Sequence, residues 1–166
     1  MGAPNVRILD GGLKAWKAAE NHVTLTPPQK KELDFIAKAD ASQFATAEEV
    51  TNAISNSSYV IVDARTPEEF AGTNETELRK GHIPSAVNLN YENLRDENGM
   101  MKTEAELKSM FESEGVTPDK TIISYCASGV RACSIYLALK QLGYPHVKVY
   151  DGSFLEWEKD LSNKVE

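Results

Sequence analysis

The residue best placed for chemistry is Cys126, which follows an apolar run at residues 121–125 and opens a short loop ending at Arg131. Apolar residues then recur at helical spacing through residues 132–142, and Gly143 ends that pattern. A thiol at a strand-to-helix turn lies where backbone N–H groups and the positive end of a helix converge. Such a site favours the thiolate over the thiol, and Arg131 adds a full positive charge. The pattern therefore predicts a nucleophilic cysteine in an anion-binding loop.

The alternative for Cys126 is a buried structural cysteine before a helix, which is the usual setting of a lone cysteine. A structural thiol does not require a small, flexible loop followed by an arginine. A cradle for a thiolate and an anion does require one, because its backbone N–H groups must turn toward the ligand. The run Ala127-Ser128-Gly129 before Val130 and Arg131 therefore favours the nucleophile.

Composition excludes several classes of function. The chain has 166 residues and a net charge of −7, which gives nucleic-acid binding no electrostatic support. Its two cysteines, Cys126 and Cys133, make neither a disulfide framework nor a metal site. No apolar run approaches the roughly 20 residues of a membrane helix, and residues 1–20 lack the apolar core of a signal peptide. We therefore expect a cytoplasmic protein with no metal, cofactor, nucleic-acid partner or membrane partner.

Strands and helices alternate along the chain, which predicts a parallel sheet with helices on both faces. Ligands of such sheets bind at the carboxyl ends of the strands, where both Cys126 and the segment Asp63-Ala64-Arg65 fall. Short apolar runs predict strands at residues 59–62, 86–89, 121–125 and 147–150. Capping residues and helical periodicity predict helices at residues 47–54, 66–70, 103–115 and 132–142.

The first residues repeat a pattern from the end of the chain. Residues 6–16 and 147–157 both show alternating apolar residues, then Asp-Gly, then a tryptophan six positions after the aspartate. Each copy predicts a strand, a tight turn and a helix that Trp16 or Trp157 packs onto a sheet. We interpret residues 1–20 as the remnant of a preceding domain repeat, 21–44 as a linker and 45–163 as a complete domain. Residues 1–20 offer a second option, a swapped dimer in which they complete another chain's sheet.

Four segments in order resemble the successive motifs of a rhodanese domain over roughly residues 45–160. They are Asp63-Ala64-Arg65, residues 81–88, the loop Cys126–Arg131, and Asp151-Gly152 with Trp157. The repeated first segment is similar to tandem sulfurtransferases, in which the second domain carries the active cysteine. The resemblance implies an α/β, rhodanese-like three-layer fold, with a central, mostly parallel sheet and helices on both faces.

The resemblance also implies a double displacement through a persulfide on Cys126. The thiolate takes sulfur from a small anionic donor, and an acceptor such as cyanide or a thiol then removes the outer sulfur. The anion contacts would be Arg65, Arg131 and Ser128. The negative charge of the persulfide would be stabilised by loop N–H groups of Ala127, Ser128, Gly129, Val130 and Arg131.

Loop length and composition bear on the substrate. Rhodanese-like tyrosine phosphatases place arginine six residues after the cysteine, whereas Arg131 is five after Cys126, so we favour sulfur over phosphate. The pair Ala127-Ser128 is closer to mercaptopyruvate users, yet residues 69–72 lack the second arginine that such members use. We therefore predict thiosulfate as the donor, with 3-mercaptopyruvate as the alternative. A persulfide carrier without turnover and a regulatory binding module are further alternatives, although such modules commonly lose the cysteine.

Three other residues have expected supporting roles. Asp63 either orients Arg65 or Arg131 through a charge-assisted hydrogen bond or forms a structural turn. His82 is expected to make a structural hydrogen bond in preference to acid–base work. Cys133 is expected in the core, with a Cys126–Cys133 redox switch as a minor hypothesis.

Overall fold

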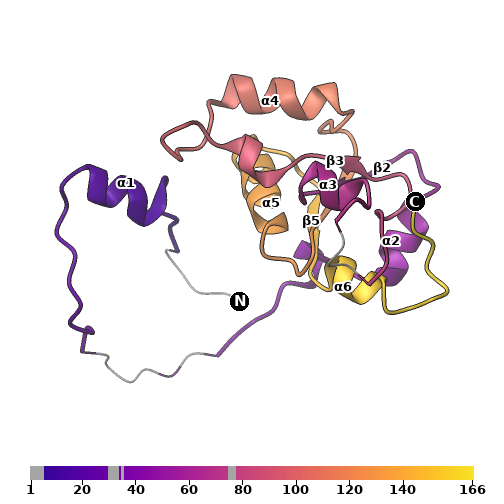
Figure 1. The fold of residues 1–166 in the computed structure, drawn as a ribbon, viewed down its shortest axis with the longest axis horizontal. Helices are drawn as coiled ribbons and strands as arrows, with labels where there is room; N and C mark the ends of the chain where they lie inside the picture. The colour runs from indigo at the N-terminus through magenta and orange to yellow at the C-terminus, as the bar shows by residue number, and fades with distance from the viewer. Residues whose placement is uncertain (1–5, 30–33, 35, 75–77) are drawn as a thin grey trace. The chain divides into compact units, whose positions relative to one another are not determined.

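The computed structural model describes residues 6–29, 34, 36–74 and 78–166 (Figure 1). The chain divides into two compact units. The larger unit comprises residues 41–94 and 103–166, and the smaller comprises residues 1–40 and 95–102. The larger unit holds the sheet and all four motif segments, and it therefore determines the site.

The sheet contains five strands in the order β1-β5-β4-β2-β3, and all neighbouring strands pair in parallel. The mostly parallel sheet predicted from the sequence is therefore confirmed. The middle strand β4 is buried from its second residue to its last, as expected for a strand covered on both faces. Its carboxyl end leads directly to the Cys126 loop. The strands are β1 (Phe44–Ala45), β2 (Tyr59–Asp63), β3 (Val87–Asn88), β4 (Thr121–Tyr125) and β5 (Val147–Tyr150).

Three helices of the larger unit begin after threonine caps, within segments that the sequence predicted as helical. The Thr46, Thr66 and Thr103 side chains each accept a hydrogen bond from the backbone N–H three residues later. Thr66 and Thr103 form complete capping boxes with glutamates. The helices are α2 (Ala47–Ala53), α3 (Pro67–Phe70), α4 (Glu104–Ser113), α5 (Ala132–Gln141) and α6 (Ser153–Trp157), with short 3₁₀ turns at Ala41–Gln43 and Tyr91–Leu94.

The core lies on both faces of the sheet. One buried cluster joins Ile61 and Ile123 of the strands to helices α2 and α6, including Trp157. Because side chains alternate along a strand, the adjacent buried residues Val62 and Ile122 face the other side. Helices α4 and α5 also carry fully buried side chains. The result is the expected three-layer α/β arrangement.

The start of the larger unit differs from the predicted boundary. It begins at Ala41, because the 3₁₀ turn Ala41–Gln43 and strand β1 belong to it and β1 pairs with β5. The sequence did not predict β1, because its two residues are too few to show a strand pattern. The predicted linker at residues 21–44 therefore overlaps the domain at its last four residues.

The smaller unit contains α1 (Gly12–Ala18) but no strand at residues 6–9. The strand prediction there was wrong, because a strand requires a hydrogen-bonding neighbour and no described residue of this unit supplies one. Trp16 is 39% exposed, so it does not pack as predicted. The remnant-repeat and swapped-dimer interpretations of residues 1–20 stay predictions, and residues 1–5 lie outside the described residues.

Two details of the smaller unit do repeat the end of the chain. Gly12 and Ser153, at equivalent positions, have φ of +55° and +53°. The indole N–H of Trp16 donates to the His22 carbonyl at 3.1 Å, and that of Trp157 donates to Lys164 at 2.8 Å. The turn and the tryptophan hydrogen bond thus recur even where the strand does not. Within the described residues, no helix is long and apolar enough to cross a membrane.

Candidate active site

Cys126 lies at the carboxyl end of β4 and is 1% exposed. The start of α6 holds its backbone on both sides. The Cys126 N–H donates to Ser153 Oγ at 3.2 Å, and the Cys126 carbonyl accepts from the Phe154 N–H at 3.0 Å. The next carbonyl, that of Ala127, accepts from the Leu155 N–H at 3.0 Å. These contacts between segments far apart in the sequence fix the beginning of the loop.

The rest of the loop leaves its backbone donors open. Within the described residues, none of the N–H groups of Ala127, Ser128, Gly129, Val130 and Arg131 donates a hydrogen bond to another protein group. Successive backbone N–H groups that are open in a turn can form a concave site for an anion, so this loop suits a negatively charged ligand. Ser128 and Val130 are exposed, which makes the loop accessible from solvent.

Gly129 meets a strict local requirement. Its φ is +86°, and a Cβ at this position would lie 2.9 Å from the Asp151 carbonyl oxygen and 3.0 Å from its Oδ1. Only glycine adopts this conformation at such a close approach without strain. The Asp151-Gly152 motif at the end of β5 thus packs directly against the Cys126 loop.

Arg131 forms a two-point ion pair with Glu69 of α3. Its two terminal nitrogens donate to the two carboxylate oxygens at 2.7 and 2.6 Å. The hydrogen bonds from Arg131 lower the pKa of Glu69 to about 2, although burial of the Glu69 carboxylate acts in the opposite direction. The same pair raises the pKa of Arg131, and the neighbouring Cys126 adds to that rise. Arg131 thus pairs with Glu69 from the loop that Cys126 opens, with its guanidinium carbon 5.9 Å from the Tyr91 ring centroid.

Arg65, in contrast, lies in the core. Its side chain has no exposed surface and pairs with Asp63 at 2.7 Å, while the same nitrogen donates to the Gly81 carbonyl at 2.8 Å. Its guanidinium carbon also lies 4.1 Å from the centroid of the Phe154 ring. The sequence-based expectation of an anion contact at Arg65 stays a prediction, because its guanidinium is paired with Asp63 and, like Cys126 itself, has almost no exposed surface. Asp63 orients Arg65 and not Arg131.

His82 and Cys133 are held by local contacts. The His82 ring shares a 2.9 Å hydrogen bond with the Phe70 carbonyl and stacks on the Phe70 ring at 3.6 Å. The Cys133 thiol is exposed on α5 and donates to the Gly129 carbonyl at 3.4 Å, so the core position expected for it is not observed. Desolvation first, and then the negative charges of Cys126 and Asp151, raise the pKa of Cys133.

Sequence reasoning missed two residues of the site, Glu69 and Ser153. Glu69 is the last residue of a capping box, and that role alone accounts for its presence in the sequence pattern. The only sequence signal was that the Glu69 carboxylate had no assigned partner, while Arg131 in the loop needed a negatively charged one. Ser153 has no comparable signal, because its hydroxyl reaches Cys126 only through the packing of α6 on the loop.

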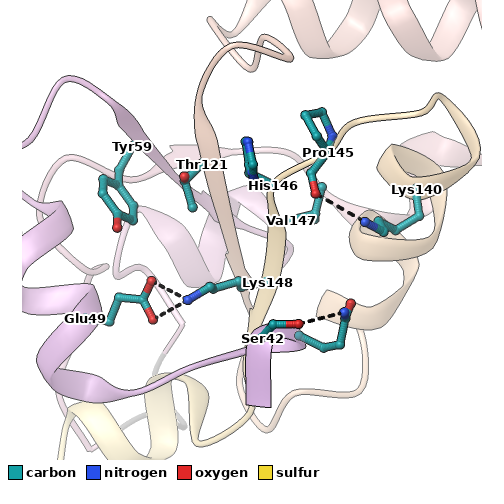
Figure 2. Close-up of a pocket in the computed structure, with 10 residues that line it drawn as sticks. Ser42, Glu49, Tyr59, Thr121, Lys140, Pro145, His146, Val147 and Lys148 are labelled. Carbon is teal, nitrogen blue, oxygen red and sulfur yellow. Dashed lines mark hydrogen bonds and ion pairs between the residues drawn. The ribbon is translucent and has the colours of Figure 1, made fainter. Parts of the chain in front are cut away.

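A pocket of about 330 Å³ lies at the opposite end of the sheet from Cys126 (Figure 2). Tyr59, Thr121 and Val147 line it, and each is the first residue of its strand. Its Lys148 is already paired with Glu49 through hydrogen bonds of 2.7 and 2.8 Å. This pocket is therefore separate from the Cys126 site. Among the described residues, no group of three or more histidine, cysteine or carboxylate side chains is arranged to hold a metal.

The fold and the loop together define a class of α/β domain with a cysteine cradle at the end of the middle strand. Residues 46–160 match the Rhodanese-like domain family, and the chain belongs to it.

Curated relatives carry two kinds of name. A putative thiosulfate sulfurtransferase of Saccharopolyspora erythraea is 37% identical over 94% of this chain and 58% of its own length. The thiosulfate sulfurtransferase of Gallus gallus is also 37% identical, and the 3-mercaptopyruvate sulfurtransferase of Rattus norvegicus is 31% identical, each over 94% of this chain and 54% of its own length. The chain thus spans about half the length of the curated relatives it matches.

Solved structures support the same fold. A variant of EanB in complex with ergothioneine has a TM-score of 0.92 and 25% identity over 99% of this chain and 42% of its own. Another EanB variant, described with a cysteine persulfide and ergothioneine, has a TM-score of 0.91 at 25% identity over 99% of this chain and 42% of its own. A persulfide on a cysteine therefore occurs in a protein that contains this fold.

Proposed function

We propose that this chain is a sulfurtransferase that moves sulfane sulfur from a small anionic donor to a thiophilic acceptor through a persulfide on Cys126. Membership of the rhodanese-like family and the names of its relatives support the reaction class. The single observation that carries the proposal is the row of open N–H groups after Cys126, with Arg131 beside the same cysteine. That combination suits a thiolate that must carry and release a negatively charged sulfur.

With thiosulfate as donor, the first step is an attack of the Cys126 thiolate on the outer sulfur. A new S–S bond forms at Cys126, the S–S bond of thiosulfate breaks, and its electron pair leaves with sulfite. In the second step cyanide attacks the outer persulfide sulfur and a C–S bond forms. The electron pair of the broken S–S bond returns to Cys126 as thiolate, and thiocyanate departs. The two steps balance without an external oxidant or reductant.

The loop stabilises charge on the transferred sulfur. Five N–H groups directly follow the nucleophile, and fixed donors of this kind cost no reorganisation when charge develops. Removing one such donor from an enzyme site typically costs about 3 kcal/mol of transition-state stabilisation. The backbone N–H groups thus stabilise the negative sulfur, which the overall charge of −7 would repel.

Thiosulfate is the favoured donor, with Arg131 and the exposed Ser128 as its contacts. The alternative is 3-mercaptopyruvate, which is named for relatives at similar coverage. Two candidates remain: a carrier that holds a persulfide without turnover, and a regulatory binding module. A carrier would keep a stable persulfide but turn over slowly with cyanide, and a binding module would form no persulfide.

The deciding experiment is the intact mass of the protein after incubation with thiosulfate and then with cyanide. We expect a gain of one sulfur atom that cyanide removes as thiocyanate, and no gain in the Cys126→Ser variant. The same test with mercaptopyruvate follows if thiosulfate leaves the mass unchanged. Sulfur loading of the Cys126→Ser variant would refute the nucleophile, and failure of the wild-type protein with both donors would refute turnover with small donors.

A further inference from the structure

Within the described residues, the ion pair between Glu69 and Arg131 holds the arginine that ends the Cys126 loop. Both terminal nitrogens of Arg131 are bound to the Glu69 carboxylate at 2.6 and 2.7 Å. The side chains are 23% and 12% exposed, so water screens the pair only in part. Arginine still has three further N–H groups, which allows it to contact an anion without releasing Glu69.

The Glu69 carboxylate is also fixed in place. One of its oxygens accepts the backbone N–H of Thr66 at 2.9 Å, and the Thr66 hydroxyl in turn accepts the N–H of Glu69. Leaving Arg131 would require the carboxylate to move while this capping box holds it. A donor anion at Arg131 therefore meets a stationary negative charge on the same guanidinium.

The other charges at this end of the sheet do not offset Glu69. The Arg65 guanidinium is paired with Asp63 in the core, and Asp151 brings a further carboxylate against Gly129. Among the charged groups of the described residues named above, only Arg131 adds positive potential to the cysteine loop, and Glu69 cancels much of it.

We propose that Glu69 is a specificity-determining residue, which limits the negative charge that the Cys126 site accepts by opposing the field of Arg131. The inference rests on the proposed function, because it concerns an anionic sulfur donor at the same cysteine. It adds a quantity that depends on the donor: the opposing effect of Glu69, in free energy, is about twice as large for the dianion thiosulfate, which stays the favoured donor, as for the monoanion mercaptopyruvate.

Two alkylating reagents of similar size test this proposal without sulfur transfer. Iodoacetate is a monoanion and iodoacetamide is neutral. The rate of iodoacetate divided by the rate of iodoacetamide at Cys126 therefore reports the local potential. Changes in the reactivity of the thiol affect both rates alike and cancel in this ratio. In Glu69→Gln we expect this ratio to rise about fivefold, the order expected for one charge removed at short range. Peptide masses distinguish Cys126 from Cys133.

Two variants serve as controls. Glu68→Gln removes the same charge from the same helical turn, but Glu68 is exposed, and we expect its ratio to stay within about twofold of the wild-type value. Glu69→Asp keeps the charge and should keep the ratio near wild type. An unchanged ratio in Glu69→Gln, or an equal rise in Glu68→Gln, would overturn the proposal.

A measurement on the wild-type protein covers the case in which Glu69→Gln fails to fold. If Glu69 compensates Arg131, the iodoacetate rate at Cys126 should change little as salt increases. A steep fall with salt would reveal uncompensated positive charge and contradict the inference. Alkylation of Cys133 alone by both reagents would overturn it too, because no anion would then reach the site.

Sulfur transfer provides an independent readout. Because electrostatic energy scales with charge, a fivefold effect on a monoanion corresponds to about twenty-fivefold on a dianion. We therefore expect kcat/KM to rise more for thiosulfate than for mercaptopyruvate in Glu69→Gln. A wild-type protein that accepts neither donor refutes the proposed function, while the alkylation ratio still decides the role of Glu69.

Discussion

Ser153 and Cys126 are joined by a buried hydrogen bond, in which Ser153 Oγ accepts the Cys126 N–H at 3.2 Å. The hydroxyl donates in turn to the Tyr150 carbonyl at 2.8 Å, so a single side chain links the end of β5 to the start of the loop. Ser153 has no exposed surface and adopts φ of +53°, a conformation that costs a non-glycine residue about 1 kcal/mol or more. The fold therefore accepts local strain at the residue that holds the nucleophile.

Replacing Ser153 with alanine should destabilise the domain and slow persulfide formation. The backbone strain remains the same, but the buried Cys126 N–H loses its acceptor, which typically costs about 1–3 kcal/mol. Urea unfolding measures the stability, and the rate of sulfur loading from thiosulfate measures the function. Ser109→Ala, on the exposed face of α4, is the control and should change neither by more than a few tenths of a kcal/mol. Wild-type loading and stability in Ser153→Ala would show that Cys126 is positioned by other contacts.

Local features of the site could be predicted from the sequence. The Thr66 and Thr103 caps, the buried strand before Cys126 and the glycine in the loop all depend on a few neighbouring residues. Their physical causes, which are side-chain capping, apolar runs and freedom of φ, act over one or two turns of chain. These predictions therefore did not require knowledge of the packing.

Contacts between distant segments could not be predicted in the same way. Arg65 and Arg131 both carry a full charge near the carboxyl ends of strands, yet one is buried against Asp63 and the other partly exposed beside Glu69. That difference depends on which side chains α3 and α6 bring to the two guanidinium groups. The strand expected at residues 6–9 fails for a related reason, because a local pattern cannot supply its hydrogen-bonding neighbour.

Gly129→Ala should destabilise the domain more than the same change at a glycine with free space. Both Gly129 and Gly143 have positive φ, at +86° and +78°, so alanine pays the same conformational cost of about 1 kcal/mol at each. Only at Gly129 would the new Cβ also meet the Asp151 backbone, 2.9 Å away, which adds an overpacking cost of about 1–3 kcal/mol. Thermal or urea unfolding of the two variants isolates that difference, and sulfur loading should fail only in Gly129→Ala. Equal stabilities would mean that the loop moves away from Asp151 without cost.

The Glu69–Arg131 pair should make stability depend on acid. Arg131 lowers the pKa of Glu69 from 4.5 to about 2, so the pair contributes its full stabilisation above about pH 4.5. Protonation removes that contribution as pH falls from 4.5 toward 2, because the unfolded chain binds the proton first. With allowance for partial exposure, the contribution is about 2 kcal/mol.

The difference in unfolding free energy between the wild-type protein and Glu69→Gln measures this contribution. It should shrink by about 1–2 kcal/mol between pH 6 and pH 3 in urea titrations. Glu68→Gln, from the same helical turn, should show no comparable convergence with the wild-type protein. A constant difference across that range would mean that Glu69 titrates alike in the folded and unfolded states.

Arg65→Met should cost far more stability than the loss of a cation at the surface. The change keeps much of the side-chain volume but leaves the Asp63 carboxylate, which has no exposed surface, without its ion-pair partner. Breaking a buried pair in this way costs about 3–5 kcal/mol. The control is Lys108→Met in the exposed Lys108–Glu112 pair, with an N–O distance of 3.8 Å, which should cost less than about 0.5 kcal/mol. Urea unfolding of both variants at neutral pH gives the comparison. A marginal loss in Arg65→Met, together with a lower affinity for thiosulfate, would instead place Arg65 in the donor site and require an opening of the core around Phe154.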